Sequence, residues 1–146
     1  MPTFLMEVTF DTTRAIANLI FNGTLERYPD ISFIFAHAGG TIPFLSWRIA
    51  LGTFVWPRAI ERAPKDAFFY LKRLYYDTGL SASPYVLRSL QELVDTSHIL
   101  FGSDYPFAPE ILTAETIKGI AAYDGFNAES KRAVEEKNAL KLFPRF

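Results

Sequence analysis

Short apolar runs alternate with amphipathic segments along this chain, and the alternation predicts an α/β fold. Three runs rich in β-branched and aromatic residues are typical of buried strands, namely 31–36, 74–78 and 99–101. Segments with helical spacing of apolar residues lie between them. Strands that are connected through helices pair in parallel with right-handed crossovers. We therefore expect about three parallel strands with surrounding helices.

Capping residues and apolar spacing predict the helices. The first is expected to begin at Asp11, Thr12 or Thr13 and to end or kink at Gly23. The others are expected over 24–27, 43–49, 64–71, 83–93, 109–123 and 128–142. No repeat, linker or low-complexity tract interrupts this order. Residues 1–146 are therefore predicted to form a single unit, although three strands leave two open sheet edges.

The composition is that of a globular protein, with 49% apolar and 21% charged residues. The aromatic share of 16%, with fourteen Phe, is high for a domain of this size. It predicts either an unusually aromatic core or an apolar surface that a partner covers.

Charge and cysteine content narrow the function further. The formal net charge is −1 and the basic residues are scattered, which argues against nucleic acid as a partner. No apolar stretch reaches the ~18 residues that a membrane span needs. The absence of Cys excludes disulfides, thiolate metal ligands and a Cys nucleophile, and it favours a cytoplasmic location.

One ionisable residue follows each predicted strand. These residues are His37, Asp77 and Asp104. Ligands of parallel α/β folds bind at the carboxyl ends of the strands, so the three residues are expected to share one rim. His98 precedes its strand and is predicted to be a surface residue at the opposite rim.

Each of these residues also has a purely structural interpretation. His37 could be satisfied by a backbone carbonyl, and Asp104 could cap the loop or helix that follows. For Asp77, bracing of the neighbouring loops is the favoured interpretation. Gly39 and Gly40 indicate a tight turn or a close backbone approach.

Metal-assisted catalysis suits this set of side chains. A carboxylate can bind a divalent cation, and a histidine beside it can give or take a proton near neutral pH. A catalytic zinc usually has three protein ligands and one open position. One His with one or two Asp is too few, so the sequence describes part of a site.

Three motifs resemble the amidohydrolase-related enzymes typified by aminocarboxymuconate-semialdehyde decarboxylase and γ-resorcylate decarboxylase. They are Phe35-Ala-His-Ala-Gly-Gly-Thr-Ile-Pro43, Tyr75-Tyr-Asp-Thr78 and Leu100-Phe-Gly-Ser-Asp-Tyr-Pro106. The resemblance implies a TIM (β/α)₈ barrel with one divalent metal, zinc in the first place and manganese or magnesium as alternatives. The three strands are similar to the sixth, seventh and eighth of that barrel, so the chain resembles its C-terminal half.

The same resemblance implies roles for three residues. Asp104 matches the metal-ligating aspartate, and His37 matches the acid/base histidine. Arg48 matches an arginine that holds a substrate carboxylate in the neighbouring subunit, a task that suits a bidentate donor. The alternative for Arg48 is an ordinary surface charge on a helix.

The implied function is non-oxidative decarboxylation of a small aromatic or unsaturated carboxylic acid. A metal-dependent hydrolase of the same superfamily is an alternative, because both reactions use one metal, one Asp and one His. The family's His-x-His pair and its fifth-strand histidine are absent, and a barrel typically needs ~250 residues. We therefore expect an incomplete site, completed in a homo-oligomer or by a separate N-terminal half. A catalytically inactive half-barrel that pairs with another chain is the third alternative.

Overall fold

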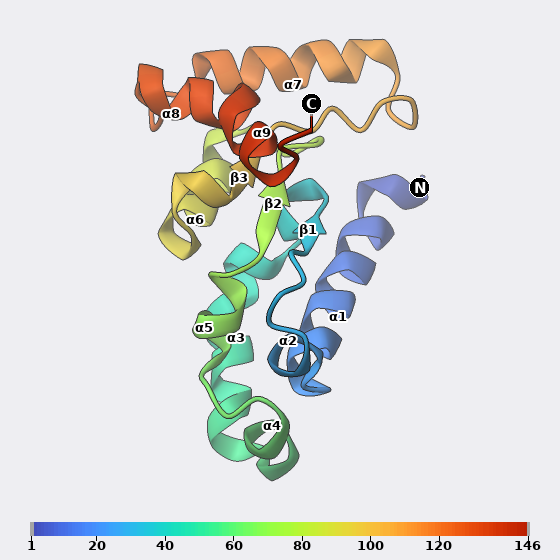
Figure 1. The fold of residues 1–146 in the computed structure, drawn as a ribbon. Helices are drawn as coiled ribbons and strands as arrows, with labels where there is room; N and C mark the ends of the chain where they lie inside the picture. Colours follow the sequence, from blue (N-terminus) through green and yellow to red (C-terminus); the bar gives the residue numbers. More distant parts are fainter. Residues whose placement is uncertain (1, 146) are drawn as a thin grey trace.

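Three parallel strands form an open sheet at the centre of the computed structural model, which describes residues 2–145. The strands are β1 (Ile34–Phe35), β2 (Tyr75–Asp77) and β3 (Ile99–Leu100), in the spatial order β1-β2-β3. Ile34 lies opposite Tyr75, and Asp77 lies opposite Leu100. The predicted α/β class with three parallel strands is confirmed (Figure 1).

Helices connect and flank these strands. Their bounds are α1 (Glu7–Phe21), α2 (Thr24–Arg27), α3 (Ile42–Val55), α4 (Pro57–Arg62), α5 (Ala67–Leu71), α6 (Pro84–Leu93), α7 (Glu110–Ala122), α8 (Ala128–Arg132) and α9 (Asn138–Leu142). Shorter turns are η1 (Thr3–Leu5), η2 (His37–Gly39), η3 (Thr96–His98) and the π-helical η4 (Ala133–Lys137). Within residues 2–145, no helix combines the length and the apolar character that crossing a bilayer requires.

The start of α1 differs from the prediction. The helix begins at Glu7, so the residues proposed as caps lie inside it. The hydroxyls of Thr12 and Thr13 donate to the carbonyls of Val8 and Thr9, four residues earlier. Threonine makes this bond readily within a helix, which is why its presence alone does not mark a helix start.

The segment after α3 also departs from the prediction. The helix α4 was not predicted, although Pro57 at its first position is a common helix start. The helix α5 begins at Ala67 because Asp66 caps it, accepting a hydrogen bond from the Phe69 amide at 3.0 Å. The predicted start at Pro64 was therefore wrong.

The core lies between the sheet and the helices α1, α3 and α6. It consists of apolar side chains with almost no exposed surface, among them Ile16, Ile20, Ile42, Tyr76, Leu87, Leu90 and Ile99. The Tyr76 hydroxyl donates to the Leu71 carbonyl at 2.9 Å, and burial raises the pKa of this phenol. On the other face of the sheet, Ile34 remains exposed.

The buried side-chain amide of Asn138 links α9 to the segment that forms β3. The Asn138 Nδ2 donates to the carbonyl of Thr96 at 2.9 Å and to that of Ile99 at 2.8 Å. Its side chain is buried, so water cannot replace these bonds without an opening of α9.

We expect Asn138→Ala to lower the free energy of unfolding by about 2–3 kcal/mol, because two buried carbonyls lose their donor. Urea denaturation measures the change. Asn18→Ala, on the exposed side of α1, is the matched control and should change stability by less than about 0.5 kcal/mol. Equal effects of the two substitutions would contradict the anchoring role of Asn138.

Candidate functional site

A left-handed turn follows β1 and carries the first candidate residue. Four consecutive residues have positive φ, with 57° at His37, 54° at Ala38, 74° at Gly39 and 68° at Gly40. A Cβ at Gly39 would lie 2.7 Å from the Tyr76 ring, and one at Gly40 would lie 2.1 Å from a backbone oxygen of α1. The tight turn and the close approach expected from this Gly pair are therefore both present.

The Asp77 carboxylate holds this turn against the end of β2. Its Oδ1 accepts hydrogen bonds from the backbone amides of His37 at 2.8 Å and Gly79 at 2.9 Å. The predicted bracing role of Asp77 is thereby confirmed. Because hydrogen bonds to a carboxylate are stronger than neutral ones, this pair offsets part of the strain of the left-handed residues.

The imidazole of His37 points toward the next strand end. Its Nδ1 lies 2.9 Å from the Gly79 carbonyl oxygen. A carbonyl can only accept, so we assign the proton of the neutral ring to Nδ1. The expectation that a backbone carbonyl satisfies His37 is thus met at Nδ1. The other ring nitrogen, Nε2, remains available for proton transfer.

Asp104 lies beside His37 at the end of β3. A Cβ placed on Gly79 would be 3.6 Å from the Asp104 Cβ and 3.6 Å from the His37 Nδ1, so the two side chains flank this glycine. Within residues 2–145, the Asp104 carboxylate has no hydrogen-bond or ion-pair partner. The capping alternative does not apply, because Pro109 occupies the N-cap of α7.

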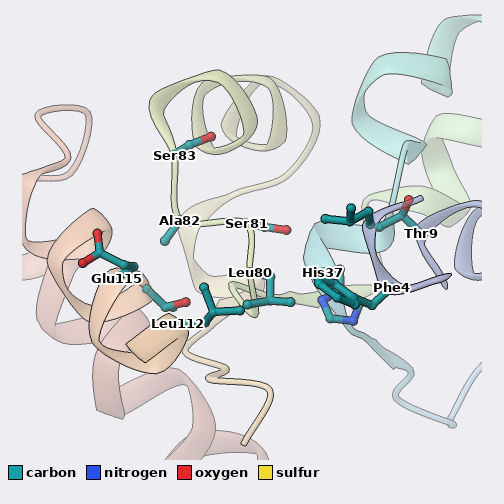
Figure 2. A pocket seen from close by; sticks show the side chains of 11 residues that line it. Phe4, Thr9, His37, Leu80, Ser81, Ala82, Ser83, Leu112 and Glu115 are labelled. Carbon is teal, nitrogen blue, oxygen red and sulfur yellow. The ribbon is translucent and has the colours of Figure 1, made fainter. Parts of the chain in front are cut away.

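Two adjoining cavities open at this rim. The first, of about 360 Å³, extends from the start of the chain to α7, and in Figure 2 Leu80 lies between Leu112 and the ring of His37. The second, of about 460 Å³, is lined by both His37 and Asp104. Its remaining lining is apolar and consists of Phe4, Val8, Leu80, Phe107, Ala108, Pro109 and Leu112.

Sequence reasoning missed these apolar lining residues. Phe4 and Leu112 lie far apart in the chain and belong to no motif, so only the fold brings them to one cavity. Leu80 follows the motif around Asp77, and its positive φ of 51° aims it at the rim. A non-Gly residue with such a φ is uncommon, but the sequence alone does not reveal it.

Arg48 and His98 lie away from these cavities. Arg48 is an exposed residue of α3 and lines neither cavity. His98 is at the opposite end of the sheet, as predicted, but it is half-buried rather than a simple surface residue. Its ring stacks on Tyr75 with centroids 4.5 Å apart, and its Nδ1 lies 3.0 Å from the Leu74 carbonyl oxygen.

The donor set of the described residues does not fit a complete metal centre. Among residues 2–145, no three His, Cys, Asp or Glu side chains converge on one point. Asp77 already accepts two amide protons, which leaves Asp104 and one nitrogen of His37 at the cavity. A catalytic divalent cation typically takes three protein ligands. This set can supply only part of such a site.

We expect Asp77→Ala to lower the free energy of unfolding by about 2–4 kcal/mol, because two backbone amides lose a charged acceptor. Asp77→Asn retains one acceptor oxygen and should lose less. Chemical denaturation measures both, with the exposed Asp30→Ala as control. If Asp77→Ala were no more destabilising than Asp30→Ala, the bracing role would be refuted.

Comparison with known proteins places the chain in one family. A family model described as Amidohydrolase matches residues 8–145. The chain is 34% identical to a 6-methylsalicylic acid decarboxylase of Penicillium expansum over 145 residues, which are 99% of this chain and 44% of that protein. The chain therefore spans less than half the length of this relative.

Solved structures agree with this placement. A crystal structure described as an amidohydrolase II superposes with a TM-score of 0.88 at 28% identity, covering 99% of this chain and 45% of the other. A 5-carboxyvanillate decarboxylase from Novosphingobium aromaticivorans, complexed with manganese, shares the fold with a TM-score of 0.81 at 22% identity, over 93% of this chain and 39% of the other. The resemblance drawn from the three motifs is confirmed, and the chain belongs to the amidohydrolase family.

Proposed function

We propose that this chain carries the proton-transfer part of the active site of a metal-dependent non-oxidative decarboxylase. The substrate is a small aromatic or unsaturated carboxylic acid. One observation carries the proposal: His37 and Asp104, from the ends of two parallel strands, line one cavity of about 460 Å³ whose other walls are apolar. Such a cavity suits a planar organic acid with one polar edge.

The architecture proposed for the whole site is a (β/α)₈ barrel in which β1, β2 and β3 are the sixth to eighth strands. Two features support this assignment. Within residues 2–145, β1 and β3 each pair on one side only, and Ile34 is exposed on the face away from the helices. Further strands would pair with both edges and would cover that face.

His37 is proposed to supply the proton of the reaction. In decarboxylation, the bond between the substrate carbon and its carboxylate breaks, the electron pair stays on that carbon, and carbon dioxide leaves. The carbon then takes a proton. With Nδ1 held by the Gly79 carbonyl, the protonated His37 can donate from Nε2 into the cavity.

Asp104 is proposed to contribute one ligand to a divalent cation, zinc or, alternatively, manganese or magnesium. The cation would supply Lewis-acid polarisation of the bound acid. The other ligands would come from polypeptide that lies outside residues 2–145. Arg48 is proposed to hold a substrate carboxylate of a neighbouring copy, because it is exposed and lies outside the cavities of its own chain.

A second candidate function is a non-catalytic half-barrel that requires a partner. The observation that favours it is the lack of three converging metal ligands among residues 2–145. The two candidates differ in whether the chain turns over an aromatic acid, and the two experiments below separate them.

The chain has only two histidines, which makes ligand binding easy to follow. We expect 6-methylsalicylic acid to shift the imidazole NMR signals of His37, because this ring lines the cavity. The signals of His98, at the opposite end of the sheet, should stay unchanged. Shifts of both rings, or of neither, would contradict binding at the proposed site.

Turnover is tested with carboxyl-labelled 6-methylsalicylic acid in the presence of Mn²⁺ or Zn²⁺. With the polypeptide that supplies the remaining metal ligands present, we expect labelled carbon dioxide, and a loss of roughly 10²- to 10⁴-fold in His37→Gln, since that substitution removes the proton donor. His98→Gln is the matched control and should retain the rate. Binding without any release of carbon dioxide would reject catalysis by this chain and favour the half-barrel.

A further inference from the structure

Leu80 stands between the two cavities of the rim. Its side chain lines both the cavity of about 360 Å³ and the cavity of about 460 Å³. In Figure 2 this side chain lies with Leu112 on one side and the ring of His37 on the other. Leu80 is 36% exposed, so a molecule that enters either cavity can contact it directly. A change in the size of this side chain therefore alters both cavities at once.

The backbone of Leu80 adopts a conformation that leucine rarely takes. The Ser81 amide donates to the Thr78 carbonyl at 3.0 Å, which closes a turn with Leu80 at its third position. The φ of Leu80 is 51°, and a turn position with positive φ favours Gly or Asn. A bulky residue persists in such a conformation only where the surrounding structure holds it, and residues of this kind cluster at functional sites.

The glycine of the same turn serves a different purpose. Gly79 does not have a positive φ, and a Cβ on it would lie 3.2 Å from the Asp77 Oδ1 and 3.6 Å from the His37 Nδ1. This position is therefore small because the rim closes around it. The Gly79 amide donates to Asp77, and its carbonyl oxygen lies 2.9 Å from the His37 Nδ1. These contacts hold the next residue, Leu80, at a set place beside the His37 ring.

The charges around Leu80 indicate which kind of group can lie against it. Among residues 2–145, no Lys or Arg lines either cavity. The carboxylates there are Asp104 in the larger cavity and Glu115 in the smaller one. A second anionic group on a ligand would face Glu115 without a cation of its own, whereas an alkyl group would contact Leu80 and Leu112. The group beside Leu80 is therefore uncharged and apolar.

The volumes show how Leu80 can limit the size of that group. Ligand sites typically measure about 300–1,000 Å³, and each of the two cavities alone lies in the lower half of this range. Joined together, they would lie near its upper end. With Leu80 in place, a substituent that projects from the larger cavity meets the leucine side chain. Without that side chain, the substituent could continue into the smaller cavity.

We propose that Leu80 is a specificity-determining residue, which restricts the substrate to aromatic acids with a short, uncharged alkyl substituent. The reacting edge of the ring lies at His37 and Asp104 in the larger cavity, and the substituent packs against Leu80. Longer alkyl chains are excluded because Leu80 closes the way into the smaller cavity. The inference rests on the proposed function, since it refines the substrate class of the same site, and the experiment below separates the two.

Ligand titrations followed by the imidazole NMR signals of His37 test the proposal. The probes are 6-methylsalicylic acid and 6-pentylsalicylic acid, which differ only in the length of the alkyl chain. The wild-type chain should bind the methyl compound roughly tenfold more tightly. One buried methylene is worth about fourfold in affinity. Leu80→Gly should therefore shift the ratio of the two affinities by roughly 30-fold or more toward the pentyl compound.

Two variants serve as controls. Leu80→Met keeps a side chain of similar volume, so the preference for the methyl compound should remain. Leu5→Gly removes the same side chain from a wall of the smaller cavity alone, and it should change the ratio by less than about threefold. Glycine suits the positive φ at position 80, and circular dichroism checks that the variant is folded. If it is not, Leu80→Asn takes its place, because Asn also tolerates this conformation.

The outcomes distinguish this inference from the proposed function. If the methyl compound shifts the His37 signals of the wild type but the affinity ratio is unchanged in Leu80→Gly, the role of Leu80 is excluded and the binding site remains. An equal change of the ratio in Leu5→Gly also overturns the role of Leu80. If neither compound shifts the His37 signals of the wild type, the proposed site fails, and the inference fails with it.

Discussion

The structure of the site depends on one carboxylate oxygen. The Oδ1 of Asp77 accepts the amide protons of His37 and Gly79, which joins the end of β1 to the end of β2. A left-handed conformation costs roughly 1–2 kcal/mol at each non-Gly residue, and both His37 and Ala38 adopt it. The charged hydrogen bonds offset this cost, and without them the turn has little reason to persist.

The rest of the rim is arranged around the same contact. Gly79 donates its backbone amide to Asp77, and its carbonyl oxygen faces the Nδ1 of His37. Asp77 therefore positions the backbone of His37 directly and the ring of His37 through Gly79. On the other side, the Thr78 hydroxyl and the Gly102 backbone bond to each other, which fixes the end of β3 and the approach to Asp104. Asp77 is thus a positioning residue, while His37 and Asp104 face the cavity.

The described residues combine a hydrogen-bonded rim at the strand ends with large exposed apolar side chains. Within residues 2–145, the sheet is open at β1 and β3, and α3 exposes the aromatic side chains of Phe44, Trp47 and Phe54. An open sheet edge can pair with a further strand, whereas the exposed side of a helix has no unpaired backbone groups and can be covered only by the packing of side chains. The aromatic share predicted either an unusually aromatic core or an apolar surface that a partner covers, and α3 does expose large aromatic side chains.

The sequence by itself determined the α/β class, the three strands and the rim that carries His37, Asp77 and Asp104. It could do so because apolar periodicity and strand-end motifs are local signals. Tertiary structure decided the rest. Helix starts such as Glu7 depend on packing more than on a cap, and Phe4 and Leu112 share a cavity only because distant segments meet there. The partners of Asp77 and the exposure of α3 depend likewise on contacts between residues far apart in the chain, which no local pattern encodes.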